Sequence, residues 1–340
     1  MNSLGNAQHL IVFAASSALA LLMTPFLGKL AKRWGVIDYP SRRRFHLEST
    51  PLMGGIAVCL VFVIVFLCAS EFHPSAKCFA VIAAAVFLTA VGLFDDIKSL
   101  SPRLKLATQF LAAALLFVFD LKVEMTGIVF LDFALTLIWV AGIVNCLNLL
   151  DNIDGLAGGT AAIAGCVFFV GAVLTGRIET AIVAAAFSGA CMGFLFHNFH
   201  PASIFSGDAG SMFMGLMLAA LGLSFMENGN GLSHLYPGVV LGLLIFDTGL
   251  VTIMRKTHGK KITDGGRDHT SHRLCYLGLS VQGSVATLFG VCALFGAAAT
   301  TMLLMPSGQA GLIPIVLFSI SIFFWFMLRN TYDYTEHNAR

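Results

Sequence analysis

Charge is scarce in this sequence. Only 11% of its 340 residues are Asp, Glu, Lys or Arg, whereas a typical soluble domain has about 25%. Hydrophobic residues make up 57% of the chain, and the mean hydropathy is +0.86. These proportions exclude a soluble fold, a disordered chain and a collagen-like chain.

Paired cysteines and early basic residues are also missing. The eight cysteines are scattered, mostly inside apolar runs, and no two of them form a CxxC pair. This spacing disfavours a disulfide scaffold or a cysteine-based zinc site. No Lys or Arg precedes Lys29, so the first apolar run lacks the basic region of a cleavable signal peptide and is expected to be a retained helix.

Long apolar runs dominate the sequence instead, and each is long enough to cross a hydrocarbon core of about 30 Å. They predict an all-α, polytopic transmembrane protein that forms a single integral membrane domain over residues 1–340. We expect about eleven spans, at 10–28, 53–70, 78–94, 106–120, 133–150, 158–176, 180–197, 209–226, 236–254, 281–305 and 311–328.

The basic residues collect on one side of these spans. If the N-terminus lies outside, the C-terminal tail and five connections face the same side, namely 29–52, 95–105, 151–157, 198–208 and 255–280. That side holds 17 of the 20 Lys and Arg residues. By the positive-inside rule it is cytoplasmic, which also places the C-terminus in the cytoplasm.

Asp95 and Asp96 end the third span as adjacent carboxylates. They repel each other and face the negative end of the helix dipole, an unfavourable arrangement unless a cation compensates it. The pair is predicted to face a metal or to accept a proton, with positive charge for an anionic substrate supplied by Lys98, Arg103 and Lys105. The alternative is a pair of solvated carboxylates at the membrane interface.

Amides and acids recur at the end of the fifth span. Asn145, Asn148 and Asp151 or Asn152 are three or four residues apart, which places them on one helix face, and Gly155 then ends the helix. Oxygen ligands beside basic residues suit Mg²⁺, which takes one or two protein ligands together with phosphate and water. Helix caps and interhelical hydrogen bonds are the alternative interpretation.

The connection before the eighth span contains Phe205 and Asp208. Gly207 and Gly210 allow the backbone to approach a ligand closely. A base could then stack on the ring of Phe205 while a metal binds the carboxylate of Asp208. The alternative is that Asp208 only caps the eighth helix.

The last large connection contains His269 and His272 among basic residues such as Arg267. A third nearby soft ligand is missing, so we expect a loop that binds phosphate rather than zinc. Asp247 lies within the ninth span and is a functional candidate because carboxylates inside membranes are costly. The alternative for Asp247 is a buried carboxyl group that pairs with a neighbouring helix.

Taken together, these motifs resemble those of the polyprenyl-phosphate N-acetylhexosamine-1-phosphate transferase family. They occur in order over nearly the whole chain, each at a predicted cytoplasmic edge. The motif residues are Asp38, Arg43, Arg44, His46, Pro51, Gly54, Gly55, Asp95, Asp96, Asn145, Asn148, Asp151, Asp154, Gly155, Pro201, Phe205, Gly207, Asp208, Gly210, Arg267, His269, His272 and Arg273.

The resemblance implies an enzyme in the bacterial cytoplasmic membrane whose active site faces the cytoplasm. Such an enzyme transfers a HexNAc 1-phosphate from its UDP donor to undecaprenyl phosphate and releases UMP, which begins a cell-envelope polysaccharide. For this chain we expect the transferred group to be GlcNAc 1-phosphate. It implies Mg²⁺ as cofactor, with Mn²⁺ as a substitute, and substrates within membrane lipid. No nucleic-acid partner is expected.

The same resemblance implies roles for single residues. Asn148 and Asp208 would bind the metal, Lys105 and the loop of His269 and His272 would bind the diphosphate, and Phe205 would stack on uracil near Asp154. Asp95 and Asp96 would act on the lipid phosphate. The candidate catalytic residues are thus Asp95, Asp96, Asp151, Asp208 and His269, and the candidate substrate-binding residues are Arg44, His46, Lys105, Asn145, Asp154, Phe205, Arg267 and His272.

Two alternatives to this function remain open from the sequence. One is the transferase of muramoyl-pentapeptide phosphate, although this chain lacks the consecutive histidines of those enzymes and has Ser271 where many relatives have His. The other is a secondary transporter, which the lack of an internal repeat disfavours. Gly238 and Gly242 form a small-xxx-small pattern, so a homodimer also remains open.

Overall fold

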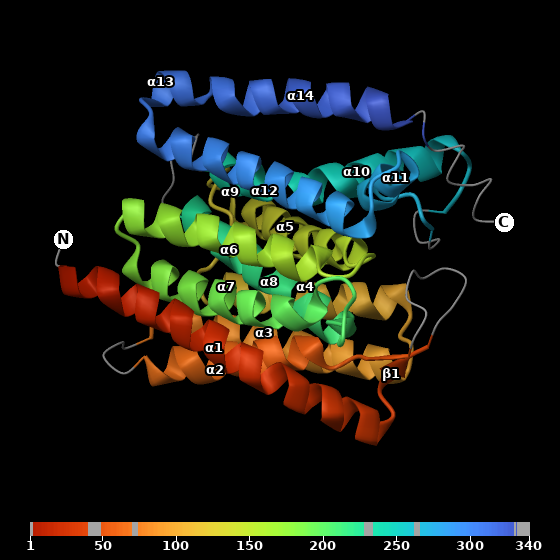
Figure 1. The fold of residues 1–340 in the computed structure, drawn as a ribbon. Helices are drawn as coiled ribbons and strands as arrows, with labels where there is room; N and C mark the ends of the chain where they lie inside the picture. The colour runs from red at the N-terminus through yellow and green to blue at the C-terminus, as the bar shows by residue number, and fades with distance from the viewer. Residues whose placement is uncertain are drawn as a thin grey trace.

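The structure, a computed structural model, describes residues 3–39, 49–69, 74–227, 234–261, 266–329 and 331. In this part the chain is an all-α bundle, as its hydropathy predicts (Figure 1). Its helices are α1 (Ser3–Trp34), α2 (Gly54–Cys68), α3 (Ala76–Ile97), α4 (Pro102–Val118), α5 (Val129–Leu150), α6 (Leu156–Leu174), α7 (Ile178–Asn198), α8 (Gly207–Met226), α9 (Leu235–Val240), α10 (Gly242–Thr257), α11 (Thr270–Tyr276), α12 (Val281–Leu304), α13 (Ser307–Ala310) and α14 (Leu312–Arg329).

The predicted spans all fall on helices. Among the described residues, eight helices are long and apolar enough to cross a membrane, namely α1, α3, α5, α6, α7, α8, α12 and α14. Helix α2 is equally apolar but has only 15 residues. The chain is therefore an integral membrane protein, while the number of spans and the side of each terminus stay predictions.

The predicted ninth span, 236–254, is not one continuous helix. Leu241 lies between α9 and α10, and its φ of −91° and ψ of 16° are outside the usual helical range. The neighbouring Gly242 lies against α12, where a Cβ atom would come within 2.5 Å of the Phe295 ring. Gly238 meets no atom within 4 Å. Gly242 thus serves a contact inside the chain, and a homodimer stays a prediction.

Helix α8 is the centre of the bundle. Almost all of its residues are buried, and it packs against α2, α3, α5 and α6. Glycine allows these close contacts: a Cβ atom on Gly55 would lie 2.0 Å from the Cα atom of Gly210, and one on Gly215 would lie 2.7 Å from the Cα atom of Val144. Small residues of this kind let helices in a membrane approach backbone to backbone.

The outer helices present apolar side chains to their surroundings. Leu328 is the one buried residue of α14, which lies beside α12 at one edge of the bundle (Figure 1). Exposed residues such as Phe318 and Phe323 would be unfavourable in water but are suited to lipid.

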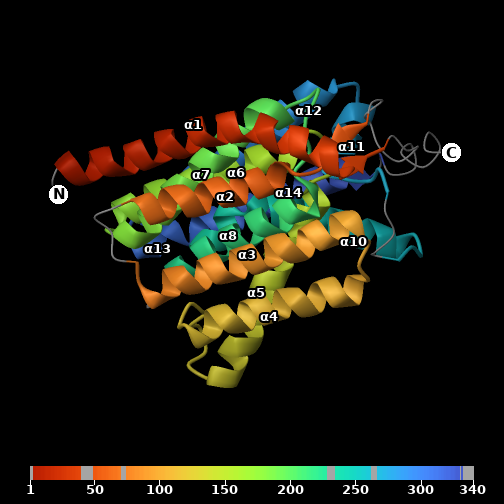
Figure 2. The ribbon, with the colours of Figure 1, turned by 90° about the horizontal axis from the view of Figure 1, so that it is seen from below.

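One end of the bundle gathers the ends of several helices. In Figure 1 it lies at the right, where a short antiparallel hairpin of β1 (Ile37–Asp38) and β2 (Thr50–Pro51) follows α1. Figure 2 shows α2 and α3 running beside α8, so the start of α2 and the end of α3 lie near the start of α8. The predicted acidic and amide motifs occur at this end.

Candidate active site

The carboxylate of Asp96 caps the first turn of α8. Its Oδ1 atom accepts the backbone N–H of Asp208 at 2.8 Å, and Oδ2 accepts the N–H of Ala209 at 3.2 Å. The N-terminal turn of a helix has unpaired N–H groups and partial positive charge, so it stabilises this anion. Asp96 therefore joins the end of α3 to the start of α8.

Two glycines make this junction sterically feasible. A Cβ atom on Gly92 would lie 2.5 Å from the Cα atom of Ala209, and one on Gly207 would lie 2.5 Å from Oδ2 of Asp96. Gly207 also has a φ of +67°, a conformation that residues with a Cβ atom adopt at a cost.

Lys105 forms ion pairs with two further carboxylates. Its Nζ atom lies 2.7 Å from Oδ2 of Asp95 and 2.9 Å from Oδ1 of Asp208. Asp95 is itself buried at the end of α3 and also accepts the backbone N–H of Leu100. The ends of three helices, α3, α4 and α8, are thus joined through a single ammonium group.

Asn148 brings α5 to the same point. Its Nδ2 atom donates to Oδ1 of Asp208 at 2.5 Å and to Oγ of Ser211 at 2.8 Å. The described residues contain no group of three His, Cys, Asp or Glu side chains placed to bind a metal. One carboxylate and one amide, with a hydroxyl beside them, nevertheless fit Mg²⁺, which completes its coordination with water and phosphate oxygens.

The loop between α5 and α6 is fastened to the loop before α8. Oγ of Ser206 donates to Oδ2 of Asp151 at 2.6 Å. The Oδ2 atom of Asp154 lies 2.8 Å from Nδ1 of His200 and accepts the N–H of Ala202 at 3.1 Å. Both carboxylates thus orient the 199–206 loop, and Gly155 starts α6 with a φ of +79°.

A second group of buried polar residues holds the histidine loop against α10. Oδ1 and Oδ2 of Asp247 lie 2.7 Å from the N–H of Thr270 and 2.8 Å from Nδ1 of His269. Two turns further along α10, the guanidinium group of Arg255 forms two 2.7 Å hydrogen bonds with Asp268. Three consecutive residues, 268 to 270, are therefore fixed by a carboxylate and a guanidinium of one helix.

This loop also reaches the loop after α5, because Oγ of Ser271 donates to Oδ1 of Asn152 at 2.6 Å. Burial raises the pKa of the Asp268 carboxyl group, but its bonds to Arg255 outweigh that effect and hold the pKa below its usual value. Asp268 and Arg255 consequently remain a charged pair.

His272 is expected to remain neutral at physiological pH. Burial disfavours its charged form, and together with the nearby His269 it lowers the pKa of His272 to about 3. The unfolded chain binds the proton near pH 6.5, so this group reduces stability as the pH falls from about 6.5 toward 3 and has no effect above that range.

The test is an NMR titration of the folded protein. The imidazole signals of His272, assigned by their loss in His272→Gln, should not shift between about pH 8 and 5, the range in which an ordinary histidine titrates. A midpoint near 6.5 would contradict the prediction.

Comparison with known proteins identifies the family of this chain. The sequence model of glycosyl transferase family 4 matches residues 78–226. A Bacillus subtilis protein described as a probable undecaprenyl-phosphate N-acetylglucosaminyl 1-phosphate transferase is 31% identical, over 92% of this chain and 89% of its own length. The chain belongs to glycosyl transferase family 4.

Further relatives represent two kinds of transferase. The decaprenyl-phosphate N-acetylglucosaminephosphotransferase of Mycolicibacterium smegmatis is 31% identical over 92% of this chain and 86% of the relative. The phospho-N-acetylmuramoyl-pentapeptide-transferase of Thermosynechococcus vestitus is 31% identical over 84% of this chain and 82% of the relative. The family inferred from the motifs is thus confirmed.

Within this family 4 transferase, the segment that matches the family model runs from the start of α3 to the end of α8 and contains the whole cluster around Asp208. Phe205 lies three residues before Asp208, and its side chain is half-buried. Its backbone N–H donates to Pro51 at 2.9 Å, and its carbonyl accepts the N–H of Gly54 at 2.9 Å. The hairpin and the start of α2 therefore fix the position of Phe205.

Not every predicted site residue joins the cluster. Asn145 lies one turn deeper than Asn148, where its Nδ2 atom donates to Oε1 of Gln109 on α4 at 2.6 Å. Arg267 is half-buried in the loop before α11. Arg44 and His46 lie outside the described residues.

Several residues that shape the site have no clear signal in the sequence. Ser206 is a small polar loop residue, and Arg255 and Asp268 belong to a charged stretch in which no single pair stands out. Asn152 belongs to the polar residues predicted at the end of the fifth span, but its bond to Ser271 could not be predicted. Arg255 and Asp268 are 13 residues apart, a separation that predicts no contact between them. Ser211 belongs to the sequence motif of Gly207, Asp208 and Gly210, but its hydrogen bond with Asn148 could not be predicted.

Proposed function

We propose that this family 4 transferase moves GlcNAc 1-phosphate from UDP-GlcNAc to undecaprenyl phosphate and releases UMP. The observation that supports this most is the cluster of Asp95, Lys105, Asn148 and Asp208 at the start of α8, within a chain similar over nine-tenths of its length to a transferase of this name. The site would face the cytoplasm of a bacterium at the inner membrane, where most basic residues lie.

The reaction is a phosphoryl transfer, in which the protein's main tasks are positioning and charge neutralisation. An oxygen of the lipid phosphate attacks the β-phosphorus of the nucleotide sugar, and the bond to the α-phosphate oxygen breaks as UMP leaves. Asn148 and Asp208 would hold Mg²⁺, which neutralises charge on the diphosphate when it is bound. Mn²⁺ has the same preference for oxygen ligands.

Lys105 would bind the diphosphate oxygens, because its side chain is 18% exposed and its ammonium group, which lies between Asp95 and Asp208, can donate to a third anion. Asp95 would orient the lipid phosphate. A phosphate monoester is mostly a dianion at pH 7, so the reaction needs little help from a base. Asp96 would position the start of α8 rather than contact the substrate, since both its oxygens already accept backbone N–H groups.

The histidine loop would complete the nucleotide site. Asp247 holds Nδ1 of His269, which leaves Nε2 of that ring for a phosphate oxygen. Phe205 would stack on the uracil ring. Asp151 and Asp154 would keep the loop before α8 in place rather than contact the reacting atoms, because their oxygens bind Ser206, His200 and Ala202.

Release of UMP by the purified protein is the test of this proposal. With UDP-GlcNAc, undecaprenyl phosphate and Mg²⁺, we expect UMP and a lipid-linked sugar in equal amounts. A panel with UDP-GalNAc and UDP-MurNAc-pentapeptide identifies the donor. If none of these donors yields a lipid-linked product, the proposed function is wrong.

The muramoyl-pentapeptide donor is not favoured, because the two relatives that cover 92% of this chain are GlcNAc transferases, whereas the muramoyl-pentapeptide transferase of Thermosynechococcus vestitus covers 84%. Membership in a transferase family likewise favours an enzyme over the secondary transporter.

Replacing Lys105 should weaken donor binding. For Lys105→Met we expect a fall in kcat/KM of about 10²-fold, since one charge-assisted contact to the diphosphate is lost. Arg103→Met is the matched control, because Arg103 lies in the same turn of α4 but is exposed. Equal losses in both variants would show that general positive charge, and not this ammonium group, matters.

A further inference from the structure

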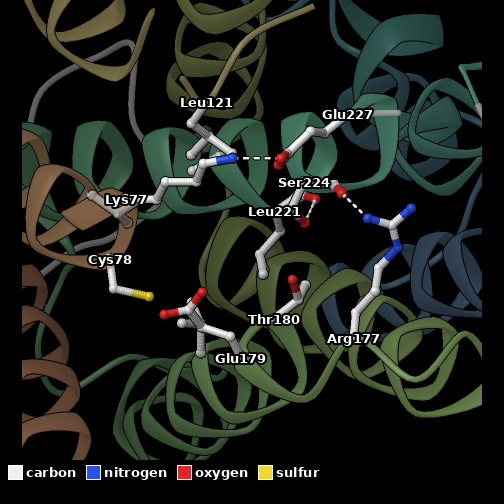
Figure 3. Close-up of a pocket in the computed structure, with 12 residues that line it drawn as sticks. Lys77, Cys78, Leu121, Arg177, Glu179, Thr180, Leu221, Ser224 and Glu227 are labelled. Atoms are coloured by element: carbon white, nitrogen blue, oxygen red, sulfur yellow. Dashed lines mark hydrogen bonds and ion pairs between the residues drawn. The ribbon is translucent and has the colours of Figure 1, made fainter. Parts of the chain in front are cut away.

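A pocket, drawn in Figure 3, is lined by residues of the helix ends that lie away from the candidate active site. Lys77 at the start of α3 and Glu227 after the end of α8 line it, whereas the far ends of the same two helices carry Asp96 and Asp208. The pocket has an empty volume of about 510 Å³ and is open to its surroundings. Its apolar walls include Val81, Leu121, Val183 and Leu221.

Two of the four charged groups that line the pocket neutralise each other. Lys77 forms an ion pair with Glu227, drawn as a dashed line in Figure 3, and its Nζ atom also lies 3.7 Å from Asp120. This pair closes one side of the pocket and leaves no net charge there.

The other two charged groups, Arg177 and Glu179, lack an ionic partner. Arg177 donates to the carbonyl of Ser224 at 2.6 Å and lies 5.3 Å from the centre of the Phe225 ring, and no carboxylate of the described residues pairs with it. Oε1 of Glu179 accepts the N–H of Ser75 at 2.7 Å, and no described Lys, Arg or His pairs with its carboxylate. Both side chains are half-buried.

A ligand that carries both charges would satisfy both groups at once. A half-buried charge without a partner is costly, and charge-assisted hydrogen bonds are among the stronger polar contacts. Because the charges of Arg177 and Glu179 add up to zero, a ligand with one phosphate and one ammonium group matches them better than a simple anion does.

The surroundings of the pocket favour a lipid. Phe79 and Ile178 follow directly after pocket residues, and they are 53% and 65% exposed. In a membrane protein such residues face acyl chains, so a headgroup in the pocket would have its chains beside them. A primary ammonium can donate hydrogen bonds to Glu179, whereas the trimethylammonium group of choline cannot.

We propose that this pocket binds the headgroup of phosphatidylethanolamine, with the phosphate on Arg177 and the ammonium on Glu179. The proposal concerns the end of the bundle away from the candidate active site and does not depend on the proposed function.

Native mass spectrometry of the delipidated full-length protein tests this. We expect phosphatidylethanolamine to bind about tenfold more tightly than phosphatidylcholine or phosphatidylglycerol with the same acyl chains. Arg177→Gln and Glu179→Gln should each remove this preference. Lys122→Gln is the matched control, because Lys122 is a basic residue at the same end that does not line the pocket.

Equal binding of the three lipids by the natural protein would overturn the proposal, and this comparison needs no variant to fold. An equal loss of preference in Lys122→Gln would also overturn it. The headgroup could belong to a lipid or to soluble phosphoethanolamine, and a competition experiment separates the two. If phosphoethanolamine displaces phosphatidylethanolamine when both are present at the same concentration, the ligand is the free zwitterion and not the lipid. The pocket variants should unfold at the same temperature as the natural protein in the same detergent, which verifies that they are folded.

Discussion

Asp208→Asn is expected to lower kcat for sugar-phosphate transfer by about 10³-fold. The substitution keeps the size of the side chain but removes the negative charge that binds Lys105 and the proposed Mg²⁺. It also places an amide group beside the Nδ2 atom of Asn148, which now donates to the carboxylate. The start of α8 should remain in place, because Asp96 caps it through backbone N–H groups.

The measurement is UMP release at saturating donor and Mg²⁺, with thermal unfolding in the same detergent as a check on folding. Asp120→Asn is the control, since Asp120 is an exposed carboxylate that also pairs with a lysine but lies outside the site. If Asp208→Asn retains more than about a tenth of the activity, the carboxylate does not hold a metal in the reaction.

Arg255→Met should cause the largest loss of stability, because it leaves the carboxylate of Asp268 buried without its partner. Breaking a buried ion pair from one side typically costs about 3–5 kcal/mol, and Arg255 and Asp268 are only 3% and 6% exposed. The loop that carries His269 should loosen as well, so transfer activity falls in parallel.

A double-mutant cycle separates this pair from general damage. Arg255→Met with Asp268→Leu should be less destabilised than the sum of the single variants, since neither charge then remains unpaired. Lys256→Met, an exposed neighbour on the same helix, should leave the unfolding temperature almost unchanged. Additive single effects would show that the two groups do not stabilise each other.

The fold could be predicted well because a membrane restricts the choices. Apolar runs of sufficient length must form helices that satisfy their own backbone hydrogen bonds, so hydropathy alone located every long helix. It could not locate the interruption at Leu241, where α9 ends and α10 begins.

The candidate site was predictable as a region but not as a set of contacts. Asp95, Asp96, Asn148 and Asp208 stood out because charged and amide groups are rare beside apolar helices. The sequence could not show that Asp96 caps a helix 112 residues away or that Asn145 turns to Gln109. Helical spacing assigns residues to one face of one helix, and partners on other helices come only from the fold.

The burial of α8 has a consequence for how the protein is made. A helix that no lipid touches in the finished bundle has to leave the bilayer and enter a space that α2, α3, α5 and α6 leave open. Since α8 follows these four helices in the chain, we expect them to be inserted before it, with the face that it later covers still open. Catalytic competence would then appear only when α8 docks, and any fragment that stops before residue 226 would be an insertion intermediate rather than a smaller enzyme.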